Sequence, residues 1–285
     1  MNKRQNSIKK HFSILQKANQ ISIEQNPFPH IVIYDALPQD LANFLTSNFL
    51  FSSFHSNVNN ARYDIPASRL SEIENLPIPW KEFIEFHTSQ EFFAELIKIF
   101  GHEIIKQNRN SFPSISSLLN MRVGTRNLDS TENCDIYLDA QISTNSAVTS
   151  ISSVREIHLD HTNKLFSGML YLRQPDDDSN GGNLNLYKWK DGYTHRDKLK
   201  YYKESLDSRH VDFYKQVTYQ NNTCIIFLNS IDALHAVTPR EITNYQRTFV
   251  NFIGELPYDI FIQRTYFIRI LQGCKSLIRK LKNAL

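Results

Sequence analysis

The chain contains 285 residues, of which 41% are hydrophobic and 12% aromatic, and it carries a formal net charge of +3. A chain of this length can form one large domain or two small ones, and its hydrophobic content argues against intrinsic disorder. The small net charge gives no reason to expect a nucleic-acid partner. Three widely spaced cysteines argue against a disulfide framework and against a thiolate zinc site. The polar N-terminus, and the lack of any apolar run approaching the ~18 residues of a membrane helix, predict a cytoplasmic protein without a membrane span.

Helical patterns dominate the N-terminal part of the sequence, around one short strand. Apolar residues at helical spacing predict a helix over about residues 4–20. The β-branched residues 31–33 lie between prolines and predict a strand. Pro38 suits the first turn of a helix over roughly residues 39–49, and the Ser-, Asn- and Pro-rich residues 50–80 predict loops.

A further helix is predicted over residues 80–101. Residues 88–91 (Thr-Ser-Gln-Glu) fit a capping box ahead of an apolar run, and Gly101 fits a helix end. We expect residues 1–118 as a whole to form an α/β support region packed on the remainder of the chain.

From about residue 119 the pattern changes from helical to strand-like, with turn-rich segments between short β-type runs. The predicted strands span residues 119–123, 136–143, 153–158, 165–172, 183–187, 217–219, 224–228, 233–237 and 247–254. About nine short strands at this spacing are typical of an antiparallel sandwich or jelly roll. The sequence therefore predicts a mainly β fold with flanking helices, and a β core over residues 119–257.

Residues 188–216 form a long connection inside this predicted core. They carry eight Lys or Arg against five acidic residues, with aromatic residues interleaved. A connection of this length is either functional or has its own secondary structure. Two interpretations stay open: a helical insertion with a solvated face, or a lid that binds the substrate, which would then be anionic or extended.

Residues 258–285 predict a C-terminal basic amphipathic helix. An apolar stripe and six Lys or Arg follow Asp259 without a further acidic residue. Such a helix can lie on a membrane surface or bind a partner. It can also dock on its own core or on a second subunit, so a homodimer is possible.

A candidate metal site begins with the triplet His158-x-Asp160. In an extended chain, residues i and i+2 point to the same face, so the two side chains would project together. His235, in a predicted strand far along the chain, is the candidate third ligand. Two histidines and one carboxylate form the facial triad of non-haem Fe(II) sites with open coordination positions.

Two further residues, Arg247 and Tyr171, suit an anion-binding site near that triad, and an arginine precedes the triplet in the sequence. Arg247 opens an apolar predicted strand, where its guanidinium is costly to bury unless it meets an anion. The Tyr171 phenol could donate to the same anion, although core packing explains it equally well. Arg155 would point away from His158 in a regular strand, and we expect it to pair with a neighbouring carboxylate rather than with a substrate acid.

These motifs resemble the prolyl 4-hydroxylase-like branch of the Fe(II)- and 2-oxoglutarate-dependent dioxygenases. The resemblance covers roughly residues 119–255. The matching residues are His158-x-Asp160, Tyr171-Leu172, Gly181-Gly182-x-Leu184, His235 with Pro239, and Arg247. The sequence departs from the family in a longer gap between His235 and Arg247 and in the insertion at 188–216.

The resemblance implies a double-stranded β-helix (a cupin-like jelly roll) with Fe(II) held by His158, Asp160 and His235. The cosubstrate 2-oxoglutarate would chelate the iron and reach Arg247 and Tyr171. Reaction with O2 would release succinate and CO2 while a C–H bond of a small molecule or peptidyl residue is hydroxylated. Two alternatives stay open: a catalytically silent jelly-roll binding protein, and a zinc hydrolase, for which Glu156 is the one candidate general base.

Overall fold

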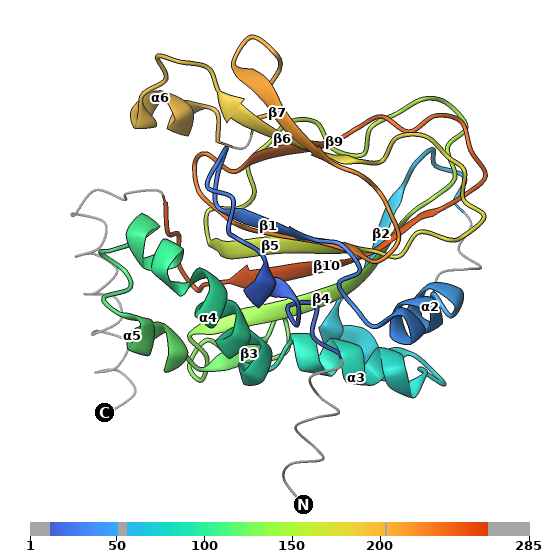
Figure 1. Cartoon of the computed structure of the whole chain (residues 1–285), viewed down its shortest axis with the longest axis horizontal. Coiled ribbons are helices and arrows are strands. Elements are labelled where there is room, and N and C mark those ends of the chain that lie inside the picture. Colours follow the sequence, from blue (N-terminus) through green and yellow to red (C-terminus); the bar gives the residue numbers. More distant parts are fainter. Residues whose placement is uncertain (1–11, 51–55, 203, 262–285) are drawn as a thin grey trace, which may run out of the picture.

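The computed structural model describes residues 12–50, 56–202 and 204–261 and shows a mainly β fold in layers. A seven-stranded sheet lies in the middle, with most of the helices on one side and a three-stranded sheet on the other (Figure 1). The helices are α2 (Gln39–Ser47), α3 (Ile78–His87), α4 (Gln90–Gln107), α5 (Ile115–Leu119) and α6 (His195–Lys200). Short 3-10 helices span Ala18–Gln20 and Ala67–Glu72.

The large sheet combines strands from both halves of the chain in the order β1-β8-β5-β10-β4-β2, and β3 also pairs with β4. All neighbours are antiparallel except β3 and β4. Its strands are β1 (His30–Ile33), β2 (Arg62–Ile65), β3 (Val123–Thr125), β4 (Ile136–Asn145), β5 (Lys164–Tyr171), β8 (Thr223–Leu228) and β10 (Arg247–Glu255). Residues 1–118 therefore contribute two strands to this sheet, and a domain boundary at residue 118 stays a prediction.

The small sheet is antiparallel, in the order β7-β6-β9. Its strands are β6 (Leu184–Trp189), β7 (Val211–Val217) and β9 (Leu234–Val237). It packs on the large sheet through an apolar cluster. Leu184, Leu186 and Val217 of the small sheet meet Ile225 and Phe227 of β8 there.

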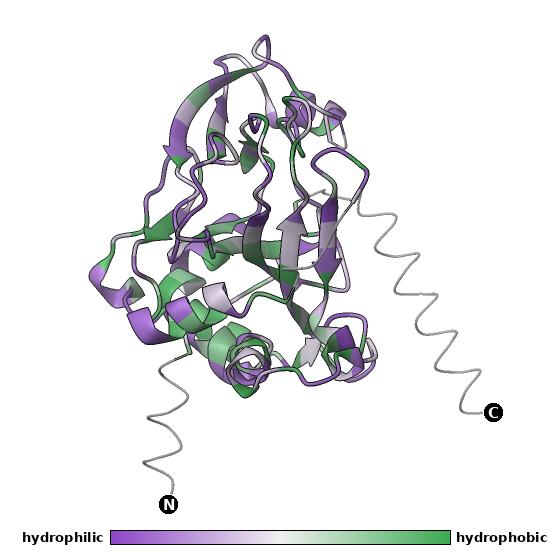
Figure 2. Ribbon diagram, turned by 90° about the vertical axis from the view of Figure 1, so that its right-hand side faces the viewer, coloured by the Kyte–Doolittle hydropathy of each residue, from purple (hydrophilic) through white to green (hydrophobic). Residues whose placement is uncertain are grey.

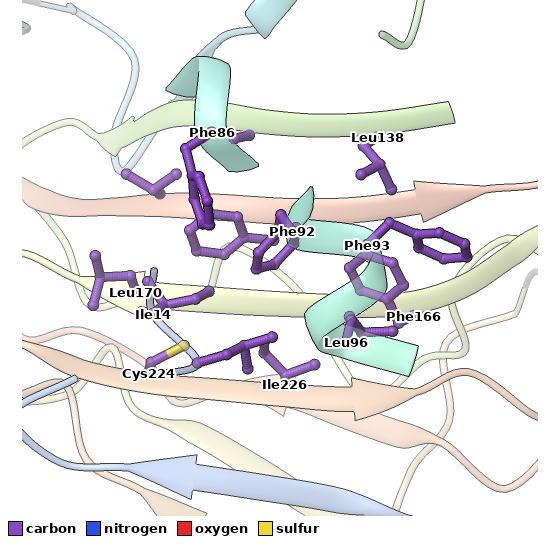
Figure 3. Packing of buried hydrophobic residues seen from close by; sticks show 14 of the residues in the cluster. Ile14, Phe86, Phe92, Phe93, Leu96, Leu138, Phe166, Leu170, Cys224 and Ile226 are labelled. Carbon is purple, nitrogen blue, oxygen red and sulfur yellow. The ribbon is translucent and has the colours of Figure 1, made fainter. Parts of the chain in front are cut away.

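Alternation along β8 explains how one sheet serves two cores. Cys224, Ile226 and Leu228 face the helices, whereas Ile225 and Phe227 face the small sheet. On the helix side, side chains of α3 and α4 interleave with those of β5 and β8 (Figure 3). The helices of this layer carry both hydrophobic and hydrophilic residues, as expected for helices with one buried face (Figure 2).

The helix predicted over residues 80–101 is in fact two helices. The helix is interrupted between α3 and α4, where the Ser89 hydroxyl caps α4 by accepting a hydrogen bond from the Phe92 amide. Gly101 does not end α4, which continues to Gln107. A Cβ at Gly101 would lie 2.6 Å from Ile115 Cδ1, so this glycine permits close packing of α5 instead.

The structure bears out most of the predicted strands, with three differences. The strand predicted over 119–123 is replaced by the end of α5 and the start of β3. The strand predicted over 217–219 begins earlier, as β7. Residues 153–158 form isolated bridges rather than a strand. There the Ser153 hydroxyl bonds to the Val237 carbonyl and to the Arg155 backbone, which competes with a regular ladder.

Two predicted helices extend outside the described residues. Of the helix predicted over 4–20, residues 4–11 are not described, and residues 12–20 hold turns and a 3-10 helix in place of the expected α-helix. The predicted C-terminal helix lies beyond residue 261 for nearly all of its length. Among the helices that are described, none is long and apolar enough to cross a membrane.

Candidate metal centre

His158, Asp160 and His235 come together although the two histidines are 77 positions apart along the chain. One ligand atom from each lies within 4.8 Å of the others. The backbone amide of each histidine donates a hydrogen bond to the backbone carbonyl of the other, with N–O distances of 3.1 and 3.2 Å. A directly paired position of this kind puts the two side chains on the same face, and the ring centroids are 4.4 Å apart.

Hydrogen bonds to backbone carbonyls select the same tautomer for both imidazoles. His158 Nδ1 lies 2.7 Å from the Glu156 carbonyl, and His235 Nδ1 lies 2.9 Å from the Ala233 carbonyl. A carbonyl oxygen can only accept, so each Nδ1 carries the proton. Each Nε2 is therefore left with a free lone pair, the arrangement that orients a metal-binding histidine.

Burial keeps both imidazoles neutral. It lowers the pKa of His158 to about 3, an effect to which the neighbouring His235 adds. Burial also lowers the pKa of His235. Neutral imidazole is the form that binds a metal ion, so this pair needs to lose no proton at neutral pH.

Asp160 is ionised. Burial alone would raise the pKa of its carboxyl, but the charge of Lys164 and the Ser167 hydroxyl lower that pKa below its usual range. Lys164 Nζ lies 3.2 Å from Oδ1, and the Ser167 hydroxyl donates to Oδ2 at 2.7 Å. Asn229, just after β8, donates its amide to Ser167 at 3.0 Å.

The residues that support Asp160 could not be predicted from the sequence. Lys164 opens β5, Ser167 lies three residues further on, and Asn229 comes from a different strand end. Neither residue of β5 belongs to a motif, and the role of Asn229 depends on the pairing of β5 with β8. The spacing of Lys164 and Ser167 from Asp160 is informative only after that pairing is known.

The insertion 188–216 packs behind the ligand-bearing segments, where its described residues extend β6, form α6 and return along β7. The Leu206 amide donates to the Ile157 carbonyl at 2.8 Å. The apolar side chains at the centre of this contact are Leu159, Trp189, Leu206, Val211, Ile231 and Leu234. Leu159 separates two candidate ligands and Leu234 precedes the third, so the insertion fixes the backbone that carries all three.

Arg247 is buried at the start of β10, with 1% of its surface exposed. It forms no ion pair with a carboxylate of the described residues. Its Nε donates to the Gly182 carbonyl at 2.7 Å and Nη1 contacts Asn145 Oδ1 at 3.3 Å, while Nη2 has no partner. A Cβ at Gly182, where φ is +74°, would lie 2.9 Å from Arg247 Cδ, so glycine is required there.

Other donors near Arg247 also lack partners. The Tyr171 hydroxyl, the Asn145 amide nitrogen and the Thr223 hydroxyl are buried without a hydrogen bond. Asn145 pairs with Arg247 across β4 and β10, and Thr223 pairs with Tyr171 across β8 and β5. Burial raises the pKa of Tyr171, so its phenol stays protonated and can donate. A buried set of unpaired donors around an arginine is suited to an anion.

A second buried arginine, Arg240, explains how the long connection from His235 to Arg247 is accommodated. Its guanidinium donates to Asn60 Oδ1 and to the carbonyls of Ser146 and Tyr245, at 2.7 to 3.1 Å. These bonds tie the connection to neighbouring loops. The burial of Arg240 is therefore explained by its hydrogen bonds within the fold, whereas the burial of Arg247 is not.

Arg155 does not occupy the place expected for it in a regular strand. The Val237 amide donates to the Arg155 carbonyl, whereas a regular ladder from the His158–His235 pair would bring Glu156 opposite Val237. The Arg155 side chain is exposed and forms no ion pair within the described part of the chain.

Neither a family model nor a curated protein matches the sequence. Similar solved structures include a Pseudomonas putida prolyl-4-hydroxylase, at 10% identity and a TM-score of 0.45, with 86% of this chain and 98% of that chain covered. A prolyl 4-hydroxylase from Phytophthora capsici gives 13% identity, a TM-score of 0.45, and coverage of 95% and 74%. A 2OG-Fe(II) oxygenase family protein from Burkholderia pseudomallei gives 13% identity, a TM-score of 0.40, and coverage of 83% and 88%.

Proposed function

We propose that this chain is an Fe(II)- and 2-oxoglutarate-dependent oxygenase that hydroxylates a C–H bond of a small molecule or peptidyl residue. The two sheets would then be the two halves of a double-stranded β-helix. The proposal also assigns the iron to His158, Asp160 and His235, and the distal carboxylate of 2-oxoglutarate to Arg247 and Tyr171.

One spatial relationship carries the proposal: the candidate metal centre and the unpaired donors face the same space. Ser167, which bonds the Asp160 carboxylate, lies on β5 at an even spacing from Tyr171, so both point to one face of the sheet. Tyr171 packs in the cluster between the sheets. A dicarboxylate could therefore reach from a metal at the triad to Arg247.

The donor set fits iron. Two neutral imidazole nitrogens and one carboxylate oxygen on one side leave the remaining coordination positions open. When bound, Fe(II) with 2-oxoglutarate and O2 would supply the oxidative decarboxylation to succinate and CO2 that accompanies hydroxylation. The chain's own residues hold the ligands in the correct protonation states, position the anion through Arg247, and exclude water by packing the two sheets together.

The proposal is tested by adding Fe(II) and 2-oxoglutarate to the full chain without oxygen. A weak visible absorption band near about 500 nm is expected from metal–keto acid chelation. It should be absent from His158→Ala. Arg247→Gln should still form the band, but at a 2-oxoglutarate concentration roughly 100-fold higher, since a charge-assisted bidentate contact is lost.

Two results would contradict the proposal in different ways. If the wild-type protein shows neither the band nor succinate release in air, the oxygenase assignment fails. If it binds 2-oxoglutarate but releases no succinate with any substrate tried, a catalytically silent binding protein explains the site better.

A further inference from the structure

The backbone next to the metal centre contains a one-residue irregularity that reorients Arg155. If a regular antiparallel ladder continued from the His158–His235 pair, Ser152 would lie opposite Glu241. In the structure, Ser152 pairs with Arg240 instead. One extra residue is therefore inserted between residues 152 and 158. The Val237 amide, which bonds to the Arg155 carbonyl, locates the extra residue next to Arg155.

Such a β-bulge changes the face on which the following side chain lies. His235 and Val237 are two residues apart on β9, so their side chains point to the same face. The residues that pair with His235 and with Val237 on the neighbouring segment therefore also point to that face. Arg155 stands opposite Val237 and so lies on the face of His158, rather than on the reverse face that a regular strand would give it.

The Arg155 side chain is exposed to solvent, so a group that arrives from outside the fold can reach it.

The other cations around the site are paired. Lys164 contacts Asp160 at 3.2 Å, and Lys198 of the insertion contacts Asp232 at 2.6 Å. Arg155 has no carboxylate partner among the described residues, so its guanidinium is free to bind an anionic group that arrives with the substrate.

We propose that Arg155 anchors a carboxylate or phosphate group of the substrate at the mouth of the metal centre. This inference rests on the proposed function and names the chemical class of its substrate. The planar guanidinium can bind either anion through two parallel hydrogen bonds. The C–H bond to be oxidised would lie a short distance from that anion.

The test uses the full chain with Fe(II) and 2-oxoglutarate and a panel of matched probes. Each N-acetyl amino acid or phosphomonoester is compared with its uncharged amide or alcohol, and succinate release above the substrate-free rate is measured. We expect acids or phosphate esters to stimulate release and their uncharged counterparts to fail. Which of the two anions acts distinguishes a carboxylate substrate from a phosphorylated one.

Substitution assigns the effect to Arg155. Arg155→Gln should raise the KM for the stimulating anion by about 10- to 100-fold with a smaller effect on kcat, and Arg155→Lys should fall between. Arg209→Gln is the matched control, because Arg209 is an exposed arginine of the insertion that pairs with Asp207. It should leave both the KM and the substrate-free rate unchanged.

The failure of this inference can be separated from that of the proposed function. If the Fe(II)–2-oxoglutarate band and substrate-free succinate release are both present, the oxygenase assignment stands. Equal stimulation by charged and uncharged probes, no stimulation by any anion, or equal KM values in Arg155→Gln and Arg209→Gln would then overturn the role of Arg155 alone.

Discussion

The Lys164 ammonium lies 3.2 Å from the Asp160 carboxylate, and the two side chains are only 12% and 13% exposed. A candidate metal ligand is thus held ionised by a partly buried cation from the next strand. Removing that cation would leave a carboxylate that is costly to keep charged away from water.

Lys164→Met should therefore destabilise the metal-free protein. We expect its free energy of unfolding, measured with urea, to fall by about 3 kcal/mol, the lower end of the cost of breaking a buried ion pair. Lys200→Met is the control, because Lys200 is 65% exposed and pairs with Asp197 on the surface. That variant should lose less than about 0.5 kcal/mol. Similar losses in the two variants would show that the Asp160 pair is solvated.

The hydrogen-bonded chain Asn229–Ser167–Asp160 should control metal affinity. Ser167→Ala is expected to weaken Co(II) binding, followed by its visible absorption, by about 10- to 100-fold, as typical for loss of a group that orients a ligand. Ser143→Ala provides the comparison, since the Ser143 hydroxyl also bonds a carboxylate, that of Asp64, at 2.5 Å. Equal Co(II) affinity in the two variants would rule out a positioning role for Ser167.

The insertion should stabilise the metal centre from behind. Leu206→Ala should lower the free energy of unfolding by about 2 to 4 kcal/mol, since it leaves a cavity between Ile157 and Leu159. It should also weaken Co(II) binding by about tenfold, because Leu206 packs with Leu159, which lies between two of the candidate ligands. Leu45→Ala in α2 removes a leucine that is also buried, from the core on the helix side of the large sheet. If both variants lose stability but keep the same Co(II) affinity, the insertion does not support the site.

Stability should fall as the pH is lowered from 7 to 5, partly because of His87. Burial lowers the pKa of His87 to about 3. In the folded protein its Nδ1 donates to the Phe83 carbonyl, and its Nε2 accepts a hydrogen bond from the Ile14 amide. The unfolded chain takes up this proton near pH 6.5, so between the two values the unfolded state binds more protons and is favoured by acid. The contribution is about 2 kcal/mol at pH 5. His87→Gln should remove about that much of the pH dependence of urea unfolding, and an unchanged dependence would contradict it.

Much of the site could be predicted from the sequence because its parts follow local rules. The His158-x-Asp160 triplet has the spacing of side chains on one face, and the structure brings both residues close to His235. Arg247 is buried without a carboxylate partner among the described residues, and an anion bound to it stays a prediction. The assignment of iron and 2-oxoglutarate to these residues stays a prediction.

The residues that could not be predicted depend on pairing between distant segments. Asn229 approaches Asp160 only because β8 lies beside β5, and Leu206 meets Ile157 only because the insertion folds back. The expectation for Arg155 assumed a regular strand, and the one-residue offset between residues 152 and 158 leaves no mark in the sequence. A glycine at position 101 is equally compatible with the end of a helix and with close packing of a second helix. Only the position of Ile115 in the structure distinguishes these two explanations.

The central claim is most directly tested by succinate production from 2-oxoglutarate in air. We expect the Fe(II)-loaded full chain to release succinate and CO2 in equal amounts, at least slowly without substrate, and His158→Ala, Asp160→Ala and His235→Ala to release neither. Succinate release that persists in all three variants, or that is absent from the wild-type protein while it binds Fe(II), would contradict an oxygenase built on this triad.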